Sequence, residues 1–184
     1  YTYASTLSHI ADTLLHKSGG YITNDIAPPG VFLDNITSWE FGALVMLRDG
    51  TTALRNHFAR DQSQSEQDPD LAIAEPYFYY EPNSWALPAT EAEFYEARGA
   101  SWALLHILRA VKHDFHDILL DKRAMRTVDI MIRELENSLT PIMSPMVLDG
   151  SGYGLFANYS LSMANHIARA NAAALDLRDI MNRG

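Results

Sequence analysis

The amino-acid sequence predicts an all-α fold, a bundle of four to five helices joined in one place by a long proline-rich acidic loop. Hydrophobic residues recur in steps of three and four over several long segments, which is the spacing of one helix face. Four prolines lie between residues 69 and 88, where a single helix cannot continue. The 184 residues and the 47% hydrophobic content suit one helical domain spanning residues 1–184.

The first predicted helix covers residues 4–17, and Gly19 and Gly20 follow it. Glycine readily adopts the left-handed conformation that ends a helix. The three-four spacing predicts that its buried residues are Leu7, Ile10, Ala11, Leu14 and Leu15.

The second helix is expected to begin at Thr37 and Glu40, which have the spacing of a capping box, and to reach about residue 66. Gly42 and Gly50 lie off its apolar seam, and we expect them to allow a neighbouring helix to pack closely. The predicted seam consists of Phe41, Leu44, Leu47, Thr51, Leu54 and Phe58.

Residues 61–96 contain nine acidic side chains and no lysine or arginine, whereas acids and bases balance in the rest of the chain. Nucleic acids and anionic lipids are bound by clustered basic residues, so we expect neither as a partner. The stretches LAIA and YFYY, residues 71–74 and 77–80, could each form a strand of a short β-hairpin.

The third helix follows a second capping-box spacing, Thr90 and Glu93, and is expected to reach about residue 118. Its seam is the most regular in the chain and consists of Phe94, Ala97, Ser101, Leu104, Leu108, Val111, Phe115 and Ile118. A fourth helix is expected over 121–139, with Ala124, Val128, Met131, Leu135 and Leu139 buried.

The last helix is expected to start at Asn158 or Ser160, either of which can act as its N-cap, and to end near residue 181. Its apolar residues predict a buried face made of Leu161, Ala164, Ile167, Ala168, Ala174, Leu175 and Ile180. The longest apolar run of the chain, FGALVML, is far shorter than the roughly 20 residues that cross a membrane as a helix.

Two polar stripes and one aromatic group are the candidate contact surface. If the second helix continues, Asn56, Arg60 and Gln64 share one face with Ser63 beside them. Asn165 and Arg169 are one turn apart on the last helix. Directional amide, hydroxyl and guanidinium groups suit a fixed anionic or polar partner, or they anchor the protein's own loops. The aromatic members are Tyr79 and Trp85.

His113 and His116 are the candidate metal ligands, because positions three apart share a helix face. The spacing matches no established zinc motif, and histidines near a helix carboxyl end also favour the helix dipole. The chain has no cysteine, which excludes disulfides and thiolate chemistry. We predict no cofactor and no catalytic residues.

Three stretches of the chain resemble a bacterial family catalogued as domain of unknown function 2333. They are GGYITNDIAPPGVFLDNITSWEFGALVMLRD, ALRNHFARDQSQSEQDPDLAIAEPYFYYEPNSWALPATEAEF and YGLFANYSLSMANHIARANAAALDLRDIM. The resemblance implies an envelope protein of proteobacteria, with one amino-terminal membrane helix before a soluble domain. It implies no activity. The chain begins at Tyr1, so we expect an upstream anchor that is the protein's sole contact with the membrane.

These observations together predict a non-enzymatic binding or scaffold domain on the periplasmic face of the inner membrane. Its partner would be an envelope protein or a small polar ligand, and the sequence leaves its oligomeric state open. The alternative is an enzyme of cell-wall or envelope metabolism that uses the carboxylates of residues 61–96.

Overall fold

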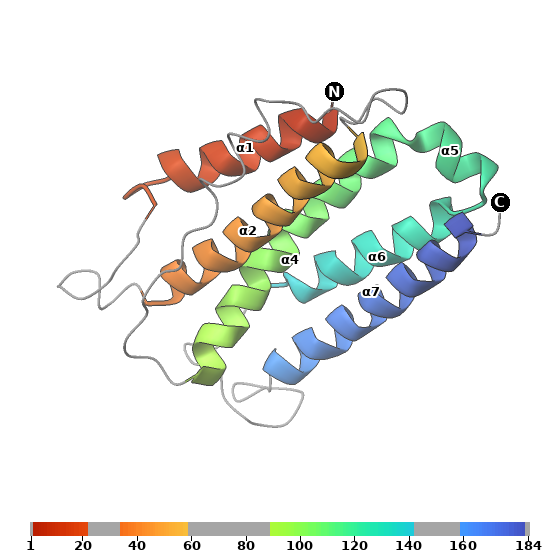
Figure 1. Cartoon of the computed structure of the whole chain (residues 1–184). Coiled ribbons are helices and arrows are strands. Elements are labelled where there is room, and N and C mark those ends of the chain that lie inside the picture. Colours follow the sequence, from red (N-terminus) through yellow and green to blue (C-terminus); the bar gives the residue numbers. More distant parts are fainter. Residues whose placement is uncertain (1, 22–33, 59–88, 142–158, 183–184) are drawn as a thin grey trace. The chain divides into compact units, whose positions relative to one another are not determined.

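The computed structural model describes residues 2–21, 34–58, 89–141 and 159–182 (Figure 1). The helices are α1 (Thr2–His16), α2 (Asp34–Ala53), the π-helical turn η2 (Leu54–Phe58), α4 (Ala89–Asp114), α5 (His116–Asp121), α6 (Met125–Ser138) and α7 (Tyr159–Asn182). No β-strand occurs among these described residues, so the all-α prediction is confirmed. The predicted acidic loop and hairpin lie outside them.

The chain divides into two compact units, one of residues 3–107 and one of residues 108–184. Helix α4 contributes its first nineteen residues, 89–107, to the first unit and its end to the second. Across the described ranges, we find no helix long and apolar enough to span a membrane.

In the first unit, α1 packs antiparallel to α2 (Figure 1). The Tyr3 hydroxyl donates a hydrogen bond of 3.0 Å to the carbonyl oxygen of Gly50, and Lys17 pairs with Glu40 near the other end. The buried stripe of α1 is Tyr3, Leu7, Ile10 and Leu14. The predicted burial of Leu15 is wrong, since that side chain is 60% exposed. Leu15 is adjacent to the buried Leu14 in the sequence and therefore points about 100° away from it around the helix axis.

Two glycines bring α2 and α4 together. A Cβ atom on Gly42 would lie 1.8 Å from the carbonyl oxygen of Glu96, and one on Gly99 would lie 1.8 Å from that of Trp39. The helix backbones are therefore too close for any side chain at either position. The expected close packing at Gly42 is confirmed, and at Gly50 a Cβ would meet the Leu7 side chain at 2.8 Å.

The predicted capping box of α2 is wrong. The helix begins at Asp34, so Thr37 lies inside it. Glu40 is fully buried and pairs with Lys17 of α1. The carboxylate therefore serves a contact between α1 and α2.

The predicted third helix is interrupted at Phe115. Helix α4 ends at Asp114 and α5 begins at His116, although the Phe115 amide still donates to the Val111 carbonyl oxygen at 2.9 Å. The change of direction moves Leu119 into the core, where it is 4% exposed, and leaves Ile118 49% exposed. The predicted burial of Ile118 is wrong for this reason.

In the second unit, α6 and α7 lie side by side and antiparallel (Figure 1). Val128 on α6, with Leu119 and Ala124, forms a core against which Leu177 and Ile180 of α7 pack. The predicted burial of Ala124, Val128, Met131 and Leu135 is confirmed.

For α7 the predicted buried face is largely wrong. The fully buried residues are Met163, Ala170 and Ala173, whereas Leu161 and Leu175 are 56% and 47% exposed. Ala164 and Ala168 are exposed as well. Helix α7 carries two apolar stripes, and packing against α6 selects the one that the sequence pattern did not favour.

Candidate functional site

Of the candidate residues predicted on the second helix and the acidic loop, the structure describes only Asn56. Asn56 lies half-buried in η2, where its Oδ1 accepts a long hydrogen bond of 3.4 Å from Arg55 Nε. Arg60, Ser63, Gln64, Tyr79 and Trp85 lie outside the described residues, as do most of the acidic side chains between residues 61 and 96. The convergence of the two polar stripes stays a prediction.

Asn165 and Arg169 both lie on the exposed side of α7, one turn apart. Arg169 also reaches α6, because its Nε donates a hydrogen bond of 2.8 Å to Glu134 Oε2. The Nδ1 atom of His166 lies 2.9 Å from the same carboxylate oxygen. A glutamate, a histidine and an arginine thus meet at the α6–α7 contact.

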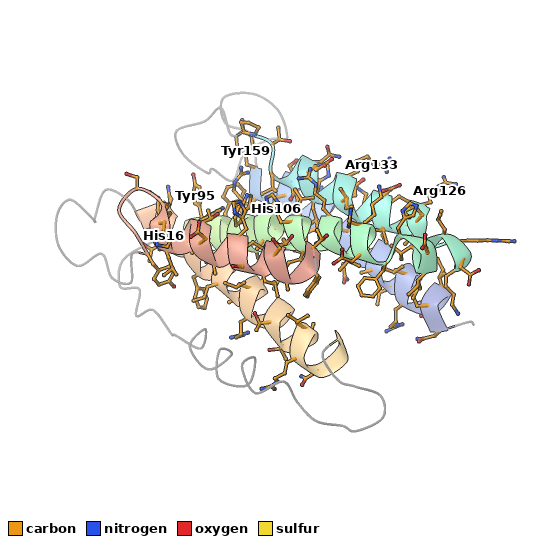
Figure 2. All side chains as sticks on the ribbon, turned by 90° about the horizontal axis from the view of Figure 1, so that it is seen from above. His16, Tyr95, His106, Arg126, Arg133 and Tyr159 are labelled. Atoms are coloured by element: carbon orange, nitrogen blue, oxygen red, sulfur yellow. The ribbon has the colours of Figure 1, made fainter. Side chains whose placement is uncertain are left out.

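Exposure increases across this cluster from Glu134 to Arg169. The side chains of Glu134, His166 and Arg169 are 9%, 22% and 54% exposed. Arg133, which projects from α6 (Figure 2), places its Nη2 at 3.8 Å from Glu134 Oε1 and is itself 63% exposed. The carboxylate is therefore enclosed by positive or hydrogen-bonding groups, and the guanidinium of Arg169 faces solvent.

The hydrogen bonds from His166 and Arg169 lower the pKa of the Glu134 carboxyl below its ordinary value of 4.5. Both groups stabilise the ionised form, the histidine through its ring nitrogen and the arginine through Nε. Glu134 is consequently a carboxylate at neutral pH, and it holds Arg169 in one orientation.

One proton on His166 decides how the imidazole bonds within this cluster. Its Nδ1 lies 2.9 Å from Glu134 Oε2 and 2.7 Å from Arg169 Nη2. A protonated Nδ1 donates to the carboxylate, whereas an unprotonated Nδ1 accepts from the guanidinium, and it cannot do both. The bond from Arg169 Nε to Glu134 is present in either case.

The cluster uses only one edge of the guanidinium. The contacts with Glu134 and His166 involve Nε and Nη2 of Arg169, and none of them involves Nη1. The outer end of a positioned guanidinium can receive a carboxylate or phosphate with little loss of side-chain entropy. Chemically, the outer end of the Arg169 guanidinium can hold an anionic group.

Glu134 and His166 are the members of this cluster that the sequence analysis missed. Glu134 lies 32 and 35 residues from its two partners, so no local spacing connects them. One signal was available, because Glu134 falls on the buried side of α6 between Met131 and Leu135. A charged residue on an apolar helix face requires a partner from another element.

His113 and His116 lie on either side of the helix break, His113 on α4 and His116 on α5. The Nδ1 atom of His113 lies 3.2 Å from Thr2 Oγ1 and 3.1 Å from Asp114 Oδ1. Within the part of the chain that the structure describes, no three histidine, cysteine or acidic residues are grouped as metal ligands. These contacts account for His113 as a hydrogen-bonding residue at the end of α4.

The family model described as "Uncharacterized protein conserved in bacteria (DUF2333)" matches in two successive segments, residues 1–94 and 92–184, which together span the whole chain. No curated protein and no solved structure matches it.

Proposed function

Because this chain belongs to the uncharacterised bacterial family DUF2333, we propose that it is a non-enzymatic binding domain of the bacterial cell envelope. It acts on the periplasmic face of the inner membrane and recognises an envelope protein or small polar ligand through an exposed carboxylate or phosphate. The observation that carries this proposal is Arg169, which is held by Glu134 and is 54% exposed.

The chemistry of Arg169 supports recognition rather than catalysis. Its guanidinium stays charged at every physiological pH and cannot act as a proton acceptor. Glu134 is held ionised by the same contact, so it is a poor general acid at neutral pH. Asn165, exposed one turn away, adds an amide that can donate to the ligand or accept from it.

Thermal unfolding of the 184-residue chain tests this proposal. The probes are inorganic phosphate, acetate and cell-wall peptides with free carboxylates. A ligand at a hundredfold excess over its Kd stabilises the fold by about 2.7 kcal/mol, which raises the midpoint measurably. We expect Arg169→Ala to abolish the shift, with each variant compared to its own ligand-free midpoint.

Arg126→Ala is the matched control, because Arg126 is an exposed arginine of the neighbouring helix α6 (Figure 2). It removes the same charge and should keep the full ligand shift. Equal loss of the shift in both variants would mean that net charge alone attracts the ligand, which contradicts a site at Arg169.

The envelope location has a test of its own. An epitope-tagged full-length protein should fractionate with the inner membrane, and protease added to spheroplasts should digest this domain. Protection of the domain until the membrane is lysed would place it on the other side and contradict the proposed location.

A further inference from the structure

His166 lies between a carboxylate and a guanidinium and cannot hydrogen-bond with both through one nitrogen. Its Nδ1 atom lies 2.9 Å from Glu134 Oε2 and 2.7 Å from Arg169 Nη2. A carboxylate only accepts hydrogen bonds, whereas a guanidinium only donates them. The two contacts therefore belong to two states of the imidazole, one with a proton on Nδ1 and one without it.

Protonation of the ring eliminates the second state. A neutral imidazole carries one proton, which can lie on Nε2 and leave Nδ1 to accept from Arg169. The imidazolium carries a proton on both nitrogens, so Nδ1 donates to Glu134 and would face the Nη2 donor of Arg169 across 2.7 Å. Arg169 then keeps the bond from its Nε to Glu134, while its Nη2 group turns away from the ring.

The charged side chains around His166 come from both helices of the α6–α7 contact. Glu134 and Arg133 lie on α6, and Arg169 lies on α7. Two guanidinium groups and one carboxylate give the cluster a net charge of plus one. The side chain of His166 is 22% exposed, so water can deliver a proton to it, and that proton raises the net charge to plus two.

Glu134 remains ionised over the pH range in which imidazoles change their charge. Hydrogen bonds from His166 and Arg169 lower the pKa of the Glu134 carboxyl below its ordinary value of 4.5, whereas imidazole side chains gain and lose a proton between pH 5 and 8. Within that range, the charge of the cluster changes only with His166.

The other charged residues of α6 and α7 that the structure describes lie away from the cluster. Two acids of α6 are about 140° or more from Glu134 around the helix axis and pair with residues of α4. The others are at least eight residues, or about 12 Å, from Glu134 or His166 along their helices. The first group is Asp129 with Lys112 and Glu136 with Arg109, and the second is Arg126, Asp176, Arg178 and Asp179.

We propose that His166 couples the anion site at Arg169 to pH, so that an anion binds together with a proton. This inference rests on the proposed function, because it concerns the regulation of the same anion site. Protonation adds a positive charge beside the bound anion and releases Nη2 of Arg169 to bind it together with Nη1. By linkage, the bound anion favours uptake of the proton to the same extent.

Sulfate is a suitable probe, because it resembles a phosphate group and keeps its double negative charge between pH 5.5 and pH 8. In a largely solvated site, one added charge at about 6 Å attracts such an anion strongly enough to lower its Kd about tenfold. Thermal unfolding midpoints at increasing sulfate concentration give that Kd. Arg169→Ala measures the general effect of the salt on stability, which is subtracted.

The wild-type chain should bind sulfate about tenfold more tightly at pH 5.5 than at pH 8. His166→Gln has no proton to gain, so its Kd should be the same at both pH values. His116→Gln is the matched control, because His116 is an exposed histidine of α5, and it should keep the full pH dependence. Equal wild-type Kd values, or an unchanged pH dependence in His166→Gln, would overturn the inference.

A measurement without ligand distinguishes this inference from the proposed function. A double-mutant cycle of His166→Gln and Arg169→Ala gives the coupling between the two side chains. At pH 8 the ring accepts from the guanidinium, so the coupling should be stabilising, whereas at pH 5.5 two adjacent cations should make it destabilising. Circular dichroism should show that each variant retains the helical fold.

The two measurements identify which proposal fails. A coupling that does not change with pH would refute the role of His166, even if sulfate binds at Arg169. A coupling that reverses its sign, with no sulfate binding at either pH, would refute the anion site and with it the uptake of a proton by the anion.

Discussion

The two compact units each enclose one glutamate where helices meet, and they pair it in different ways. In the first unit, Glu40 is fully buried and its partner Lys17 is only 20% exposed. In the second, Glu134 is 9% exposed, whereas its partner Arg169 is 54% exposed. An interior ion pair can only hold helices together, but a pair at the edge of a unit also presents its cation to solvent.

The helices are also brought together in different ways. In the first unit, α2 and α4 approach until Gly42 and Gly99 leave no space for a Cβ atom. In the second, α6 and α7 pack through larger side chains, among them Val128 and Leu177. Backbone contact tolerates no added atom, whereas side-chain packing can relax around a change.

The two units can be followed separately within one molecule, because the three tryptophans, at 39, 85 and 102, all precede residue 108 in the sequence and residues 108–184 contain none. The ring centroids of Trp39 and Trp102 lie 5.1 Å apart, and those of Trp102 and His106 lie 4.8 Å apart. Tryptophan fluorescence therefore reports unfolding of the first unit, and circular dichroism reports that of both.

The largest effect is expected for Gly42→Ala. The new Cβ would lie 1.8 Å from the Glu96 carbonyl oxygen, so the two helices must separate. We expect a loss of about 4 kcal/mol or more in the free energy of unfolding, measured by urea denaturation with tryptophan fluorescence. Gly50→Ala is the control, because its Cβ would meet only the ends of side chains. A loss below that of Gly50→Ala would refute backbone contact as the reason for the glycine.

Lys17→Met should have the next largest effect. It removes the ammonium group that pairs with the buried carboxylate of Glu40 and leaves that charge in the interior. We expect the free energy of unfolding to fall by about 3 kcal/mol, at the low end for a broken buried pair because Lys17 is partly exposed. Lys122→Met, at the half-buried C-cap of α5 in the other unit, should cost much less. Similar losses in both variants would mean that pairing with the buried Glu40 carboxylate gives Lys17 no special contribution to stability.

Leu119→Ala tests the helix break at Phe115. Leu119 is 4% exposed and its neighbour Leu120 is 53% exposed, so only the first should contribute to the core. We expect a loss of about 2 kcal/mol for Leu119→Ala, because half-buried Phe115 and Met125 can shift into the space. Leu120→Ala should change the free energy of unfolding by less than about 0.5 kcal/mol. The reverse order would show that α4 continues without a break.

The smallest effect, about 1 kcal/mol at pH 7, is expected for Glu134→Gln. The folded-state pKa of Glu134 lies below 4.5, so its stabilisation is complete above that pH. It is lost as the pH falls through the lower folded-state value. Between pH 6 and pH 3, the wild type should therefore lose more stability than Glu134→Gln.

Glu136→Gln is the control for this pH dependence, because Glu136 is 45% exposed and pairs with Arg109 at 2.6 Å. An exposed pair contributes little, so this variant should follow the wild-type pH profile within about 0.5 kcal/mol. Parallel profiles for Glu134→Gln and the wild type would show that the cluster with His166 and Arg169 contributes no pH-dependent stability.

The sequence by itself determined the helical class and the positions of most helices. The spacing of Leu7, Ile10 and Leu14, or of Val128, Met131 and Leu135, depends only on the period of a helix, and these residues are buried. Gly42 was identified for the same kind of reason, since a glycine within a helix lowers its stability unless another element needs the space. The candidate site was predicted only in part, because the sequence analysis identified Arg169 but neither Glu134 nor His166.

Only the tertiary structure decided which surfaces meet. Helix α7 has two apolar stripes, and periodicity alone cannot select between them; the packing of α6 buries Met163 and exposes Leu161. Glu40 and Glu134 likewise acquire their roles from Lys17 and Arg169, which come from other helices. A periodic pattern depends only on the geometry of one helix, whereas burial and ion pairing depend on where a second helix packs against it.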